Sequence, residues 1–152
     1  MPRKPLIYTH ENPYHVFARS NNQEWFYLPK PEVWFIFKEC LNEASERFGF
    51  QVYLFVLMDN HYHMIAQCSP QHNLGEVMGW LQKTVSKNIN HRANKINHVF
   101  GGVYKACLLQ HPDHFATAYK YVALNPVAAG ISSNVFTYPF LSLNNQKFRL
   151  RR

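Results

Sequence analysis

A nearly continuous apolar run, Phe50 to Met58, constrains the fold more than any other part of the sequence. The run is rich in Val, Tyr and Phe and is too short for a fully buried helix, so it predicts a central β-strand. Asp59 and Asn60 follow and form a tight turn. The next segment, His61 to Cys68, is then expected to return as the antiparallel partner strand. This hairpin is the centre of the predicted sheet.

The remaining segments predict a ferredoxin-like fold. Tyr14–Arg19 alternates with a period of two, as a strand does, and a fourth strand is expected at Val103–Leu109. Apolar residues recur at spacings of three and four after Pro31, from Leu74 and after Pro112, which predicts three helices. The order is β-α-β-β-α-β followed by a helix. The predicted fold class is therefore α+β: an antiparallel sheet with two helices on one face, an extra C-terminal helix and a face left free for a site.

Length and composition predict one folded domain with two extensions. The chain has 152 residues, of which 47% are hydrophobic. We assign a basic arm to residues 1–13, the domain to 14–131 and a tail to 132–152. Three widely spaced cysteines without a Cys-x-x-Cys pair argue against a disulfide framework or a zinc knuckle. We find no signal peptide and no apolar run near the ~20 residues of a membrane span, so we expect a soluble, cytoplasmic protein and no membrane partner.

The charge of the chain predicts a polyanionic partner. Its 16 Lys and Arg against 9 Asp and Glu give a net charge of +7. We expect contacts with nucleic acid from residues in the arm, at the first loop, on the second helix and, as a weaker candidate, on the fourth strand: Arg3, Lys4, Arg19, Lys83, Lys87 and Lys105. A charged stripe on a helix is also compatible with a solvated surface, so this alternative stays open for the second helix.

His61 and His63 have the spacing of two residues on one face of a strand, with Cα atoms ~6.5–7 Å apart. Imidazole is the commonest metal ligand in proteins. Two rings so placed can bind one ion and leave positions open for a third ligand and a substrate. The spacing is also compatible with two solvated histidines on an exposed strand.

The third predicted helix carries a tyrosine away from its core face. The core stripe consists of Phe115, Ala118, Tyr119 and Val122. Tyr121 lies off this stripe and four residues before Asn125, so the two side chains can contact one neighbour. A free phenol is ionised in only about one molecule in a thousand at pH 7, a deficit of about 4 kcal/mol that a divalent ion can reduce. Tyr121 is thus a candidate nucleophile, or else a partly exposed structural residue.

Two motifs together resemble a known family. His61-Tyr62-His63 and the later segment Tyr121 to Gly130 (YVALNPVAAG) are similar to the motifs of single-tyrosine transposases in the His-hydrophobe-His nuclease superfamily. The resemblance is greatest to the REP-associated tyrosine transposases of bacteria. It spans about Tyr14 to Ile131 and includes the segments 19–22 (RSNN), 48–50 (FGF), 57–63 (LMDNHYH) and 100–102 (FGG).

The resemblance implies an activity and assigns residues to it. The family cleaves and rejoins single-stranded DNA beside imperfect palindromic hairpins, with a 5′-phosphotyrosine intermediate and a free 3′ hydroxyl. Carried over, His61 and His63 would be metal ligands, Asn125 a third ligand and Tyr121 the nucleophile. The implied cofactor is Mg²⁺ or Mn²⁺, the partner is single-stranded hairpin DNA, and the enzyme would be a monomer or homodimer in a bacterial cytoplasm.

The sequence departs from the family pattern at several positions. Related enzymes often have glutamine at the position of Asn125, and the other departures are Asp59 for proline, Ser20 for glycine and Val103 for arginine. Asp59 would be either a partner of a histidine or a turn residue. The alternative function is a non-enzymatic module that binds single-stranded DNA or RNA, because RNA-recognition motifs share this order of elements. That alternative leaves the histidine pair and Tyr121 without a role.

Overall fold

The computed structural model describes residues 6–21, 26–96 and 98–144. Their strands and helices follow the predicted order: β1 (Tyr14–Arg19), α1 (Lys30–Phe48), β2 (Gln51–Leu57), β3 (His61–Gln67), α2 (Leu74–Ala93), β4 (Lys105–Leu108) and α3 (Pro112–Ala128). Two short 3-10 helices, Val135–Thr137 and Ser142–Asn144, come after α3. The predicted α+β fold is confirmed.

The four strands form one antiparallel sheet in the order β2-β3-β1-β4. In the register of β1 with β3, Arg19 lies opposite His61 and Phe17 lies opposite His63. Phe17 also lies opposite Lys105 of β4. Because residues opposite one another point to the same face of a sheet, all five side chains belong to one face.

The strand β4 is shorter than the predicted Val103–Leu109, and a long-range contact explains its late start. Phe100 forms an isolated bridge with Ser20, and the N–H of Gly101 donates to the carbonyl of Arg19. These bonds hold the chain at the end of β1 before it turns to pair along that strand. Regular pairing therefore begins only at Lys105.

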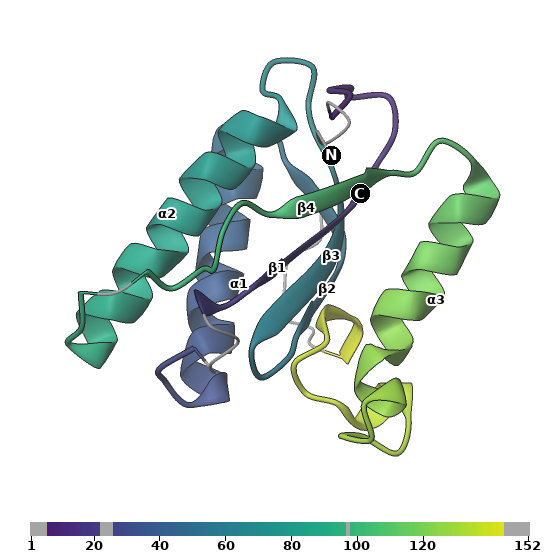
Figure 1. Ribbon diagram of the computed structural model, residues 1–152. Helices are drawn as coiled ribbons and strands as arrows, with labels where there is room; N and C mark the ends of the chain where they lie inside the picture. Colours follow the sequence, from purple (N-terminus) through teal and green to yellow (C-terminus); the bar gives the residue numbers. More distant parts are fainter. Residues whose placement is uncertain (1–5, 22–25, 97, 145–152) are drawn as a thin grey trace, which may run out of the picture.

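Helices α1 and α2 pack side by side on one face of the sheet, as predicted (Figure 1). Aromatic rings fill the space beneath them, and Phe37 of α1 lies 5.2 Å from Phe55 and 5.1 Å from Tyr62 between ring centroids. Gly49 ends α1 in the left-handed conformation, with φ of 64°, which glycine adopts without steric cost. This large core fixes β2 and β3, the strands on either side of the Asp59–Asn60 turn.

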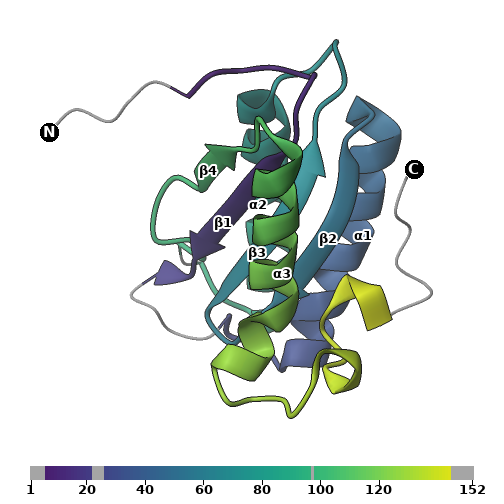
Figure 2. The same ribbon diagram turned by 90° about the vertical axis from the view of Figure 1, so that its right-hand side faces the viewer.

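Helix α3 packs on the opposite face and forms a second, smaller core. Its buried residues come from the sheet, from α3 and from the segment after it: Leu54, Val56, Met58, Ile65, Leu109, Ala118, Val122, Ala123, Tyr138 and Leu141. Figure 2 shows α3 over the side of the sheet that contains β2 and β3, with β1 and β4 beside it. The face predicted to be free is thus half covered, and α3 lies along the edge of the open half.

The described part of the predicted tail is folded against β2. Tyr138 Oη donates to the carbonyl of Leu57 at 2.6 Å, and the N–H of Phe55 donates to Ser142 Oγ at 2.9 Å. Leu141 also bridges Val56. These contacts cover the outer edge of β2. The boundaries of the arm, domain and tail stay predictions, and no described helix is both long and apolar enough to cross a membrane.

Candidate active site

His61 is the first residue of β3, and the turn before it fixes the orientation of its ring. The N–H of Met58 donates to the carbonyl of His61 and closes the hairpin. His61 Nδ1 lies 2.8 Å from Asn60 Oδ1. An amide oxygen only accepts, so Nδ1 carries the proton and Nε2 carries the lone pair. Asp59 instead forms a salt bridge with Lys30, which favours the turn role over the histidine-partner role.

His63 lies beside His61 and is deeper in the structure, with 7% of its surface exposed. The two rings are 5.2 Å apart between centroids and nearly perpendicular, at 86°. The other neighbour of His63 is His15 of β1, whose Nε2 lies 3.0 Å from His63 Nδ1. Both His61 and His63 thus have Nδ1 occupied by a neighbour.

The electrostatic surroundings keep both rings neutral. Burial, followed by the charges of His15, His61 and Arg19, lowers the pKa of His63 to about 3. Burial is also the main cause that lowers the pKa of His61, with Arg19 second, and the hydrogen bond to Asn125 opposes the shift. A metal ligand must be the neutral imidazole, so these pKa shifts favour ligation at neutral pH.

Helix α3 brings Tyr121 and Asn125 to the histidines. Val122 is fully buried in the second core, and this seats the helix on the sheet. The ring of Tyr121, which is 56% exposed, lies 5.5 Å from the ring of His63. One turn later, the Asn125 side chain hydrogen-bonds His61. The four residues singled out for chemistry therefore meet at one place in one chain.

The donor set at this place suits a divalent ion. Imidazole nitrogen, here the two Nε2 atoms, is a common ligand of transition-metal ions. Carbonyl oxygen, here that of the Asn125 amide, is a common ligand of Mg²⁺ and Mn²⁺. Within residues 6–21, 26–96 and 98–144, no three His, Cys, Asp or Glu side chains are grouped so as to hold a metal. An arrangement of two histidines and one amide does not depend on such a group.

The segments before and after the histidines in the predicted motif also converge here. The N–H of Ser20 donates to the carbonyl of Asn60 at 2.8 Å, and the N–H of Gly101 donates to that of Arg19 at 3.1 Å. A Cβ atom on Gly101 would lie only 3.1 Å from the carbonyl oxygen of Ser20, a tight contact, so the close approach of these two segments favours glycine. Arg19 is held next to His61 as a result.

The predicted DNA-contacting residues are divided between two sides of the molecule. Arg19 and the exposed Lys105 share the sheet face of the histidines. Lys83 and Lys87 are exposed on α2, in the layer on the other side of the sheet. Arg3 and Lys4 lie outside the described residues.

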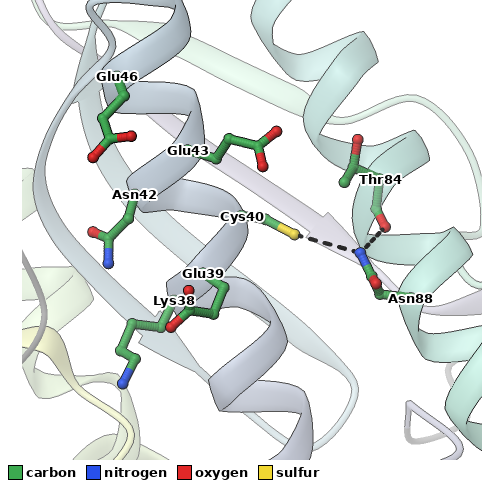
Figure 3. Close-up of a pocket in the computed structure, with 8 residues that line it drawn as sticks. All are labelled: Lys38, Glu39, Cys40, Asn42, Glu43, Glu46, Thr84 and Asn88. Carbon is green, nitrogen blue, oxygen red and sulfur yellow. Dashed lines mark hydrogen bonds between the residues drawn. The ribbon is translucent and has the colours of Figure 1, made fainter.

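A polar groove between α1 and α2 is a separate feature, shown in Figure 3. Its volume is about 620 Å³, and its lining includes Glu39, Glu43 and Glu46. Three carboxylates repel a nucleic-acid backbone. The groove also lies in the layer opposite α3, so it is not part of the site around His61.

Comparison with known families identifies the chain. A family model described as "Transposase IS200 like" matches residues 9–125, well over half of the 152 residues and including all four site residues. The chain belongs to the IS200-like transposase family. The predicted resemblance to transposases is therefore confirmed, and the protein is a DNA-processing enzyme of the transposase class. No curated protein sequence matches this IS200-like transposase.

Two solved structures share the fold of this IS200-like transposase. A REP-associated tyrosine transposase bound to a REP hairpin is 14% identical, with a TM-score of 0.76, over 100% of this chain and 89% of the other. A protein described as a transposase, from Deinococcus radiodurans, is 12% identical, with a TM-score of 0.53, over 82% and 95%. At these identities the likeness establishes the fold.

The site of this transposase also contains His15, a residue that the sequence reading missed. His15 occupies the mixed face of β1 and contacts both His63 and Tyr121, whose ring centroid is 5.8 Å away. The sequence feature that could have revealed His15 is the alternation of β1, which places His15, Phe17 and Arg19 on one face of the strand. Without the register of β1 against β3, that face could not be matched to His63.

Proposed function

We propose that this transposase nicks and rejoins single-stranded DNA beside hairpin or palindromic repeats, through a 5′-phosphotyrosine on Tyr121. The observation that carries the proposal is the contact of Tyr121 with His63, together with that of Asn125 with His61. Family membership supports transposition of DNA. The hairpin bound to the structural relative supports hairpin DNA as the substrate class.

His61, His63 and Asn125 would hold the Mg²⁺ or Mn²⁺ ion. When bound, such an ion polarises the scissile phosphate and stabilises negative charge on the departing oxygen. Asn60 orients the ring of His61 through Nδ1. The pKa of both imidazoles is lowered, so both rings are neutral at pH 7 and neither loses a proton when the ion binds.

Tyr121 would carry out the bond exchange. Its Oη attacks the phosphorus and gives up its proton, and the bond between phosphorus and the 3′ oxygen breaks. The 3′ oxygen takes a proton and leaves as a hydroxyl, while the 5′ phosphate stays on Tyr121. Rejoining reverses the exchange when a 3′ hydroxyl attacks the phosphotyrosine. Because the ring of Tyr121 contacts His63 of its own chain, we propose that it acts within one subunit.

Arg19 and Lys105 would bind the phosphates of the strand on the open half of the sheet face. We expect Arg19→Ala or Lys105→Ala to weaken binding of single-stranded DNA and to lower the slope of log affinity against log salt by about 0.7. Lys83→Ala and Lys87→Ala are matched removals of a positive charge from α2. Affinity titrations at four salt concentrations measure the slope, and a larger loss for the α2 variants than for Arg19→Ala would place the DNA on the other layer.

The experiment that tests the proposed function looks for a covalent adduct. The protein is incubated with single-stranded hairpin DNA from the flanks of its own gene, with Mg²⁺, Mn²⁺ or EDTA, and run on a denaturing protein gel. We expect a DNA-protein adduct with either ion and none with EDTA. Binding of the same DNA in EDTA, with no adduct under any condition, would contradict the proposal and favour a non-enzymatic binding module.

A further inference from the structure

We infer that His15 is a positioning residue, which accepts a hydrogen bond from His63 Nδ1 and so directs the Nε2 lone pair of His63 toward the ion. The metal part of this inference rests on the proposed function, whereas the effect of His15 on the ring of His63 does not. His15 is not a member of the predicted ligand set, and it lies 48 residues from His63 in the sequence.

The pairing of β1 with β3 creates the contact. Phe17 lies directly opposite His63, and His15 is two residues away on the same strand and the same face. Diagonal neighbours of this kind are within reach of aromatic side chains. The two imidazole rings are 5.2 Å apart between centroids, and the atoms Nε2 of His15 and Nδ1 of His63 are 3.0 Å apart. This distance is that of a hydrogen bond.

The position of one proton decides what this hydrogen bond does. A neutral imidazole has a proton on one nitrogen and a lone pair on the other, and the hydrogen bond at one nitrogen selects the form. If His63 Nδ1 donates to His15, the lone pair is at Nε2. Asn60 has the same effect on His61, because its Oδ1 accepts from Nδ1. Both proposed ligands are then in the same tautomer, in which each Nε2 atom carries the lone pair that can bind the ion.

Besides His15 and His61, two aromatic rings contact the ring of His63. Phe17 stacks on it, 5.4 Å away with an angle of 29° between planes, and Tyr121 meets it edge-on at 5.5 Å and 82°. Both rings confine His63, but their faces and edges do not choose between its nitrogens. His15 adds the directional polar contact and also packs against Tyr121. One side chain thus helps to place a ligand and the nucleophile.

Two variants at position 15 separate the hydrogen bond from simple packing. His15→Phe keeps a ring of similar size but removes the acceptor, whereas His15→Gln keeps an acceptor near the position of Nε2. Long-range ¹H–¹⁵N spectra of the metal-free proteins report the tautomer of His63 directly. We expect the Nδ1-protonated form in the wild type and in His15→Gln, and a mixture with the Nε2-protonated form in His15→Phe.

Binding of Mn²⁺ alone, without DNA, is the second measurement. Loss of a hydrogen-bond partner of a ligand typically costs 10–100-fold in metal affinity, so we expect a loss of about that size in His15→Phe and substantial rescue in His15→Gln. His72→Gln removes a histidine from the N-terminal end of α2 and should leave Mn²⁺ affinity unchanged. Thermal melts confirm that each variant is folded.

The outcomes distinguish the inference from the proposed function. An unchanged His63 tautomer and unchanged Mn²⁺ affinity in His15→Phe would overturn the inference, even if the wild type forms the covalent adduct. A His63 tautomer that responds to His15, in a wild-type protein that binds no Mn²⁺ and forms no adduct, would support the hydrogen bond and refute the proposed metal-dependent function.

Discussion

Tyr121→Phe is expected to abolish the covalent DNA-protein adduct and to lower strand cleavage by at least about 10⁴-fold, because it removes the atom that forms the bond to phosphorus. The phenylalanine ring can keep the contacts of Tyr121 with His63 and His15, so the rest of the site stays in place. Tyr121 is 56% exposed, and loss of its hydroxyl should change the free energy of unfolding by less than about 0.5 kcal/mol. Single-turnover cleavage on denaturing gels measures the rate.

Tyr119→Phe is the matched control on the same helix. Tyr119 packs against Phe115 on the partly buried side of α3, with 6.0 Å between ring centroids, so its substitution also removes one hydroxyl from α3. We expect its cleavage rate to stay within about twofold of the wild type, because Tyr119 lies away from the four site residues and its ring contacts are kept. An adduct of undiminished yield in Tyr121→Phe would mean that another residue is the nucleophile.

Local patterns predict most of the fold, and long-range contacts account for the differences. The alternation of Tyr14–Arg19 locates β1 at the bounds that the structure has, and Gly49 marks the end of α1. The late start of β4 depends instead on the bridge from Phe100 to Ser20, which no local period reveals. The folded segment after α3 likewise depends on Tyr138, which bonds to Leu57, 81 residues away.

In the candidate site, too, local spacing predicts some features and long-range contacts decide the others. Strand period places His61 with His63, and helix period places Tyr121 with Asn125, because both spacings are local. The distance between the two pairs is set by the second core, to which Val122 of α3 and Ile65 of β3 both belong. His15 joins the site only through the register of β1 against β3. Which lysines lie on the face of the histidines likewise depends on the side of the sheet to which α2 packs, and local spacing does not give that side.

The second large effect is expected on the affinity of the site for a metal ion. His61→Ala is expected to lower Mn²⁺ affinity by more than about 100-fold, since loss of a mere hydrogen-bond partner of a ligand already costs 10–100-fold. Adduct formation should fall with it, because only His63 and Asn125 of the three proposed ligands then remain. Titration calorimetry with Mn²⁺ in the absence of DNA measures the affinity independently of activity.

A second pair of histidines provides the control for this experiment. His111 and His114 lie at the start of α3, with ring centroids 5.0 Å apart, and His114 is exposed. Imidazole is the commonest metal ligand in proteins, so His114→Ala tests for metal bound at this pair. We expect it to retain Mn²⁺ affinity and adduct yield within about twofold of the wild type, as for a surface change away from the site. Loss of Mn²⁺ binding in His114→Ala, with His61→Ala unaffected, would move the metal to the start of α3 and leave His61 and His63 as polar residues of an open sheet face.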